Sequence, residues 1–146
     1  MKSTIFIFLL LVTMSCQNSE RKQIEQLVKE WTDREILLPE GPVFTRFATD
    51  TVSYTIQPAR YKVIVFVDSV GCISCKLQLP KWKDLINEVD SLSETDIPFL
   101  FFFQTKNVSE IRHILRCDNF ANPVCIDTAD DLYKLNRFPS NMMFQT

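Results

Sequence analysis

Two cysteines in the segment VDSVGCISCKLQLPKW, residues 67–82, are the residues of this chain best suited to chemistry. Cys72 and Cys75 have two residues between them, a spacing that serves a zinc site, a structural disulfide or thiol–disulfide exchange. On a helix this spacing places both sulfurs on one face, where a thiolate at Cys75 can attack a mixed disulfide at Cys72. The elements around the pair must decide between these uses.

A buried strand followed by a helix is predicted around the cysteine pair. The run YKVIVFVD, 61–68, is almost entirely apolar and rich in β-branched residues, which predicts a strand covered on both faces. Apolar residues recur at helical spacing through 72–92 and predict a helix there. Cys72 would then open the helix, where unpaired backbone N–H groups stabilise a thiolate. This context favours exchange, with Cys72 attacking and Cys75 resolving the mixed disulfide.

Strands and helices are expected to alternate through the rest of the chain. After a hairpin at 43–57, the expected elements are strands at 61–68, 97–104 and 122–127, helices at 72–92, 108–116 and 128–138, and a last strand begun by MMFQT. We expect Thr128 and Asp131 to form a capping box on the last of these helices. The order predicts an α/β fold, with a central, mostly parallel sheet and helices on both of its faces.

The chain has 146 residues, of which 46% are hydrophobic, and a net charge of −2. This is enough for one domain with a hydrophobic core. No block of basic residues is interleaved with aromatic ones, so we expect no nucleic-acid partner.

The first residues, MKSTIFIFLLLVTMSC, resemble a bacterial lipoprotein signal. A signal peptide over 1–15 would make Cys16 the lipidated N-terminus, while cleavage as an ordinary secretory signal is the alternative, because Thr13 and Met14 depart from the usual motif. We therefore expect a lipid-anchored protein of the bacterial cell envelope, on a periplasmic or outer face. In such a compartment disulfides persist.

Residues 16–40 are predicted to form an N-terminal amphipathic helix and spacer, followed by a domain at 41–146. Ile24, Leu27, Val28 and Trp31 recur at helical spacing on one face of that helix. The helix would act either as a spacer between membrane and domain or as an element packed on the domain.

The segment VIVFVDSVGCISCKLQLPKW resembles the active-site segment of the thioredoxin superfamily. In that family C-x-x-C-K is followed by a proline five residues after the second cysteine, and Cys75, Lys76 and Pro80 stand in those places. The segment NPVCIDTADDLYKLNRF, 122–138, is similar to the strand-then-helix segment of the TlpA/ResA-like branch and of related AhpC/TSA-type domains. The resemblance covers about 61–146.

The resemblance implies a thioredoxin-like fold and a redox-active disulfide between Cys72 and Cys75. It implies no cofactor, a protein disulfide or dithiol as substrate, and a redox partner protein that resets the pair. We expect Pro80 to kink the helix. Lys76 would add positive charge nearby, although we expect a solvated surface lysine. Asp68 could relay protons to Cys75, but we expect it to cap the loop or to face water.

The family also places a cis-proline opposite the dithiol. Pro139 is one candidate, and an alternative alignment puts Gln145 and Thr146 there with no proline. Because the family's sheet continues with two more strands and a helix, the resemblance implies a domain that is incomplete at its C-terminal end.

Two other interpretations of the cysteines stay open. The chain could be a non-catalytic scaffold or binding lipoprotein in which the bond between Cys72 and Cys75 is permanent. A zinc set could also be written from the pair with His113 and Cys117, although a whole helix and strand separate its halves, so we expect no metal. Cys117 and Cys125 are expected to be two buried free thiols, with a disulfide between them as the alternative.

Overall fold

The computed structural model describes residues 21–70, 72–92 and 96–138. The chain divides into two compact units, Met1–Ile36 and Leu37–Thr146. The described part of the first unit is a helix over 21–31, with an ion pair of 2.9 Å between Arg21 and Glu25 on its exposed surface. The signal peptide predicted for 1–15 and the lipidation site at Cys16 lie outside the described residues. Among the helices that the structure describes, none is long and apolar enough to cross a membrane.

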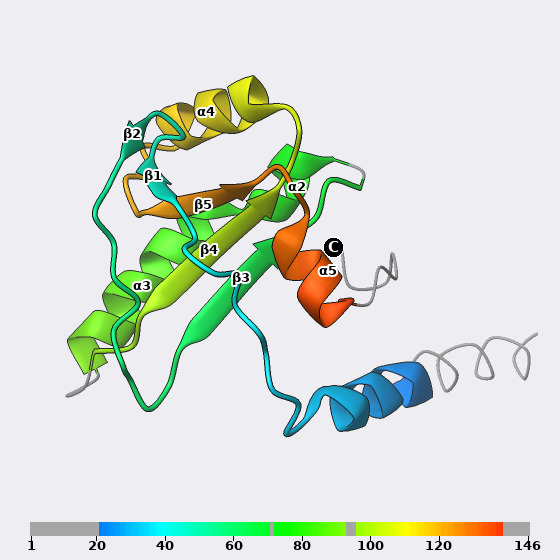
Figure 1. Cartoon of the computed structure of the whole chain (residues 1–146). Helices are drawn as coiled ribbons and strands as arrows, with labels where there is room; N and C mark the ends of the chain where they lie inside the picture. Colours follow the sequence, from blue (N-terminus) through cyan, green and yellow to red (C-terminus); the bar gives the residue numbers. More distant parts are fainter. Residues whose placement is uncertain (1–20, 71, 93–95, 139–146) are drawn as a thin grey trace, which may run out of the picture. The chain divides into compact units, whose positions relative to one another are not determined.

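The second unit is a mixed α/β unit built on a five-stranded sheet (Figure 1). Its strands are β1 Phe44–Arg46, β2 Asp50–Thr51, β3 Val63–Val67, β4 Phe99–Gln104 and β5 Val124–Asp127, in the spatial order β2-β1-β5-β4-β3. Strands β3, β4 and β5 are parallel, whereas β1 is antiparallel to both β5 and β2. The prediction of an α/β fold is therefore confirmed, with a parallel half that carries the cysteine pair and an antiparallel half formed by the hairpin.

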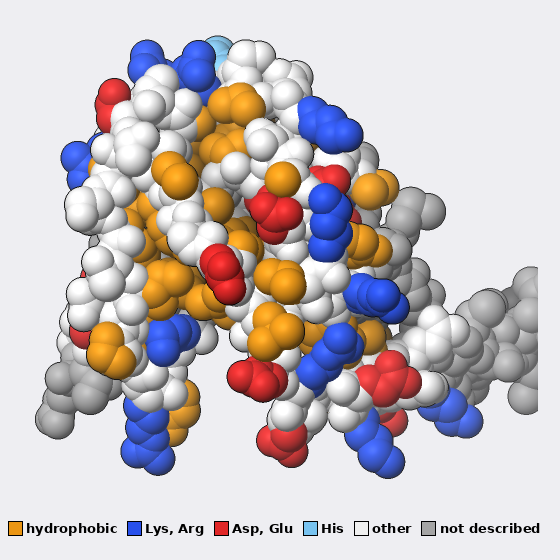
Figure 2. Space-filling model, viewed as in Figure 1, with side chains coloured by type: hydrophobic (Ala, Val, Ile, Leu, Met, Phe, Trp, Pro, Cys, Tyr) orange, Lys and Arg blue, Asp and Glu red, His pale blue; other side chains and the backbone are white. Residues whose placement is uncertain are grey.

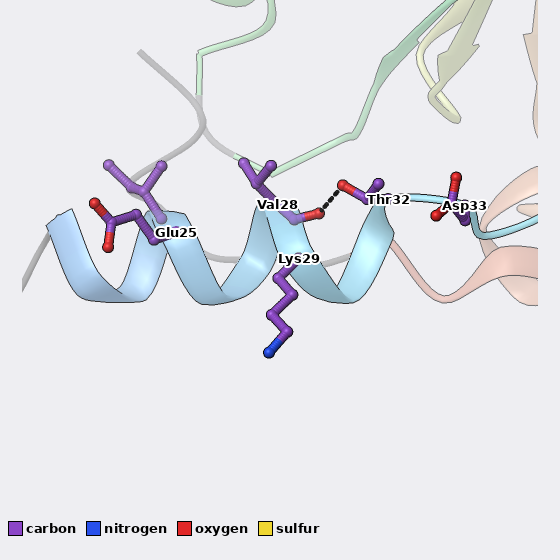
Figure 3. A pocket seen from close by; sticks show the side chains of 6 residues that line it. Glu25, Val28, Lys29, Thr32 and Asp33 are labelled. Carbon is purple, nitrogen blue, oxygen red and sulfur yellow. Dashed lines mark hydrogen bonds between the residues drawn. The ribbon is translucent and has the colours of Figure 1, made fainter.

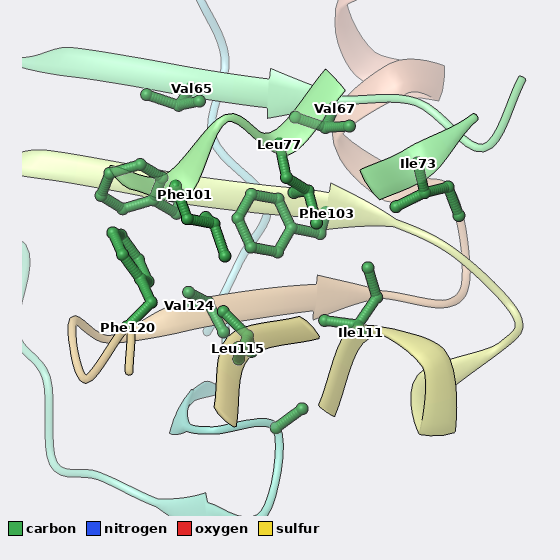
Figure 4. Packing of buried hydrophobic residues seen from close by; sticks show 12 residues of the cluster. Val65, Val67, Ile73, Leu77, Phe101, Phe103, Ile111, Leu115, Phe120 and Val124 are labelled. Atoms are coloured by element: carbon green, nitrogen blue, oxygen red, sulfur yellow. The ribbon is translucent and has the colours of Figure 1, made fainter. Parts of the chain in front are cut away.

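Both faces of the parallel strands are covered, as their apolar runs predict. The helices are α2 Ile73–Leu77, α3 Leu79–Leu92, α4 Val108–Cys117 and α5 Asp131–Asn136. Phe101 and Phe103 of β4 point to the face where α2, α3 and α4 pack (Figure 4), and their neighbours Leu100 and Phe102 point to the face that α5 covers through Leu132. Successive strand residues alternate between faces, so an unbroken apolar run fits two hydrophobic layers.

The predicted hairpin is shorter than its sequence pattern. β2 ends at Thr51, so the prediction of a strand through 57 is wrong. Val52, Tyr54 and Ile56 still alternate because they pack on the same hydrophobic cluster, with the Tyr54 ring centroid 4.6 Å from that of Phe44. The alternation reports burial on one side of an extended segment, which does not require a partner strand.

The helix predicted over 72–92 is two helices. Gln78 separates them in a left-handed conformation, with φ 40° and ψ 40°, and its carbonyl accepts the N–H groups of Lys81 and Trp82. Pro80 is the second residue of α3, a position in the first turn where its missing N–H removes no helical hydrogen bond. The prediction that Pro80 kinks one continuous helix is therefore wrong, because it lies in the first turn of a second helix.

The cap of α5 also differs from the prediction. The helix begins at Asp131, after Asp130, and Thr128 is not its N-cap residue. The buried carboxylate of Asp127 accepts the N–H groups of Asp131 and Leu132, each at 2.9 Å. The Asp127 carboxylate, at the end of β5, therefore caps the helix, and the predicted capping box at Thr128 does not.

We expect Asp127→Ala to lower the free energy of unfolding by about 1–3 kcal/mol, because it leaves two helix N–H groups without a charged acceptor. Thr128→Ala, at an exposed neighbouring position, should change it by no more than about 0.5 kcal/mol. Urea unfolding of both variants measures the difference. A larger loss of stability for Thr128→Ala than for Asp127→Ala would mean that Thr128, and not Asp127, caps the helix.

Candidate redox site

The cysteine pair lies where β3 ends and α2 begins, at the carboxyl edge of the parallel strands (Figure 1). Cys72 is the N-cap residue of α2, with an extended backbone at φ −78° and ψ 103°. Its Cα is 5.4 Å from that of Cys75, and the two sulfurs form a disulfide. Buried Ile73 and Leu77, on the opposite side of the five-residue helix, hold α2 against the core.

Two donors surround the sulfur of Cys72. The backbone N–H of Cys75 donates to Cys72 Sγ at 3.3 Å, and the hydroxyl of Ser74 lies 3.3 Å from the same atom. After reduction these groups are placed to hydrogen-bond a thiolate at Cys72, which favours its charged form. The N–H of Cys75 is one of the unpaired N–H groups at the start of the helix, so this contact agrees with the predicted effect of the helix start, although α2 ends after Leu77.

Solvent exposure does not separate the two cysteines. Cys72 and Cys75 are both exposed, and Cys117 at the end of α4 is exposed as well. The expectation that Cys117 is buried is therefore wrong, and exposure does not distinguish Cys72 from Cys75. The two cysteines differ in hydrogen bonding, because the Cys75 N–H and the Ser74 hydroxyl both lie at the sulfur of Cys72.

Lys76 is largely buried rather than solvated. Its side chain is 10% exposed and its ammonium group forms an ion pair with Asp68, whose side chain is 17% exposed. The ammonium group also donates to the carbonyl of Val70, and the N–H of Val70 donates to Asp68 Oδ1 at 3.1 Å. The expectation of a surface lysine is therefore wrong, whereas the partly exposed Asp68 caps the loop, which is one of the alternatives expected for it. The sequence shows no periodic signal for this pair, which is eight residues apart.

The two remaining described cysteines are free thiols in different surroundings. Cys125 is buried in β5, and this burial, with the nearby carboxylates of Asp127 and Asp131, raises the pKa of its thiol to about 11. Its reactive thiolate form is therefore scarce near neutral pH. Neither Cys117 nor Cys125 takes part in a disulfide.

The zinc interpretation finds no support among the described residues. They contain no group of three or more His, Cys, Asp or Glu side chains placed to hold a metal ion. His113 instead lies beside Cys117 on the exposed face of α4, with Nε2 3.5 Å from Sγ. The structure does not bring these two residues and the disulfide into one ligand set.

The first unit carries a surface hollow along its helix (Figure 3). Ile24 and Val28 line it together with charged residues such as Glu25 and Lys29, and the hydroxyl of Thr32 donates to the carbonyl of Val28 at 2.6 Å. Among the residues that the structure describes, those that line the hollow include no thiol or imidazole group. The thiol chemistry of the described chain therefore belongs to the second unit.

Pro139, Gln145 and Thr146, the alternatives for the segment opposite the dithiol, lie outside the described residues, as does the strand predicted at MMFQT. Charged side chains of both signs lie beside hydrophobic ones on the face that Figure 2 shows. Comparison of the chain with family models, with curated proteins and with solved structures finds no significant match in any of the three.

Proposed function

We propose that this protein is a thiol–disulfide oxidoreductase that works through Cys72 and Cys75. The observation that carries the proposal is an exposed disulfide at C-x-x-C spacing, held between a buried parallel strand and a helix, with N–H and hydroxyl donors at Cys72 Sγ. A bond used only to staple the fold gains nothing from exposure or from donors aimed at one sulfur. Both features favour attack by a thiolate.

The exchange balances without a cofactor. In the reduced protein the Cys72 thiolate attacks one sulfur of a substrate disulfide, forms a mixed disulfide and releases the first substrate thiolate. Cys75, deprotonated, then attacks the Cys72 sulfur and releases the second. Two electrons pass from the protein to the substrate, and the bond between Cys72 and Cys75 is restored. A partner protein with a dithiol reduces it again, or the reverse sequence oxidises a substrate.

We further propose that the second unit is a thioredoxin-like domain of the TlpA/ResA-like branch. The C-x-x-C-K sequence with Pro80 supports this, together with the mixed sheet flanked by helices. Lipid anchoring at Cys16 in a bacterial envelope is a separate proposal, supported by the apolar run and small residue before that cysteine.

The reduction potential of the pair tests the function. We expect equilibration of a Cys117→Ser variant with glutathione buffers to give a value between about −120 and −270 mV, the range of disulfide-exchange proteins. The substitution removes the exposed thiol at Cys117, which would otherwise form its own mixed disulfides. A value below about −300 mV would identify a permanent bond and favour a non-catalytic scaffold.

A further inference from the structure

We propose that the ion pair between Asp68 and Lys76 positions the dithiol, and that its two charges act in opposite directions on the reduction potential of the Cys72–Cys75 disulfide. The inference rests on the proposed function and adds to it two positioning residues. It starts from the inward turn of Lys76, the residue directly after Cys75.

Lys76 bonds to the loop before Cys72 through its side chain and to Cys72 itself through its backbone. Its ammonium group bonds Asp68 and the Val70 carbonyl, and its backbone N–H donates to the Cys72 carbonyl at 3.3 Å. Asp68 fastens the same loop through the N–H of Val70. The residues on both sides of the turn into α2 are thus tied to one residue, through its ammonium group and its backbone N–H, which fixes where Cys72 begins the helix.

The fold has little need of a buried lysine at this place. Ile73 and Leu77 already anchor α2 in the core, and Lys76 could extend into water at the end of a short helix. A largely buried ion pair gives little or no net stability, because the desolvation of both charges offsets their attraction. An ion pair placed beside a disulfide is better explained by its effect on the thiols than by its contribution to folding.

The two charges are close enough to act on Cys72. The Lys76 ammonium group and the Asp68 carboxylate both bond to Val70, two residues before Cys72. Because successive Cα atoms are about 3.8 Å apart, each charge lies on the order of 10 Å from the thiol, about one Debye length at 0.1 M salt. The cation of Lys76 favours a thiolate at Cys72, and the anion of Asp68 disfavours it. Stabilising the thiolate stabilises the reduced state and makes the disulfide a stronger oxidant.

Other charged groups at this edge of the sheet have partners of their own. Asp127 accepts the N–H groups at the start of α5, and Asp130 accepts a hydrogen bond of 2.9 Å from the Gln104 side chain. Asp127 is the last residue of β5 and Asp130 lies three residues after it, so neither residue is itself altered by substitution of Asp68 or Lys76. They form a constant background against which the two substitutions can be compared.

The test uses the variants Lys76→Gln and Asp68→Asn, singly and together, in the full chain with Cys117→Ser. Glutamine keeps N–H donors for the Val70 carbonyl and for Asp68 but carries no charge. Lys76→Gln should shift the equilibrium with glutathione about threefold to tenfold toward the disulfide, which is ~15–30 mV lower in potential. Asp68→Asn should shift it by a similar factor in the opposite direction. The double variant should lie near the parent.

A second measurement follows Cys72 alone. In the reduced protein the pH midpoint of alkylation at Cys72 should rise for Lys76→Gln and fall for Asp68→Asn. Lys81→Met removes an exposed lysine five residues further along. It should change the equilibrium constant with glutathione, and the acid dissociation constant read from the alkylation midpoint, by no more than about twofold each. Lys76→Arg keeps the charge and should retain the parent potential.

Shifts of the same sign from Lys76→Gln and Asp68→Asn would overturn the proposal, because they would report only a loosened loop. Equal effects of Lys76→Arg and Lys76→Gln would overturn it too, and so would the absence of any shift. Failure of the proposed function looks different, as a parent potential below about −300 mV. In that case the alkylation midpoints of the chemically reduced protein still measure how the charges of Lys76 and Asp68 affect the Cys72 thiol.

Discussion

A Cys75→Ser variant is expected to accumulate a stable mixed disulfide through Cys72, while Cys72→Ser is expected to form almost none. The mixed disulfide normally disappears when Cys75 attacks the Cys72 sulfur, and a serine hydroxyl cannot make that attack. Each variant should lose turnover with a protein disulfide by at least about a hundredfold, since two-step exchange needs both thiols. Mass spectrometry of the trapped species gives both the position of the bond and the identity of the partner.

The Cys117→Ser background serves as the control for this trap, because Cys117 is the other exposed thiol of the described chain. Cys125 needs no substitution, since its burial and its raised pKa of about 11 keep it protonated near neutral pH. Equal trapping by Cys72→Ser and Cys75→Ser would contradict the assigned roles. The outcome is informative because the two sulfurs differ in their hydrogen-bond donors and not in exposure.

The second large effect is expected at Phe101, a buried residue of the main hydrophobic cluster (Figure 4). Its side chain is 1% exposed, and its ring packs edge-on against Trp82 at 5.9 Å and Phe120 at 5.0 Å between centroids. Phe101→Ala should lower the free energy of unfolding by about 3–5 kcal/mol, through lost burial and the cavity left behind. Against a typical total of about 5–15 kcal/mol this is a large share of the stability.

Leu92→Ala is the matched control for Phe101→Ala. Leu92 is 77% exposed at the end of α3, so its truncation should change the free energy of unfolding by no more than about 0.5 kcal/mol. Urea unfolding of the parent and both variants measures the two values. Similar losses at Phe101 and Leu92 would mean that the β4 layer is not packed as described.

The sequence by itself determined the buried strands next to the site and the start of the helix at Cys72, but not the break of that helix at Gln78. The apolar runs at 61–68 and 97–104 predict strands with two covered faces, and β3 and β4 lie inside those runs with side chains in both clusters. The spacing of Cys72 and Cys75 predicted two thiols within reach of each other, and the structure bonds them. These features are local in the chain, because periodicity and short spacings fix which residues share a face.

Tertiary structure alone decided how the site is supported. The sequence around Lys76 and Thr128 suggests a surface lysine and a capping box, but Lys76 turns inward to Asp68 and the cap comes from Asp127. Each outcome depends on competition between possible partners, which is settled by the positions where β3 and β5 end. Burial of Cys125 and exposure of Cys117 likewise follow from which segments cover them. A charge or a thiol is stabilised by neighbours that folding brings together, and these neighbours are not encoded in any local pattern.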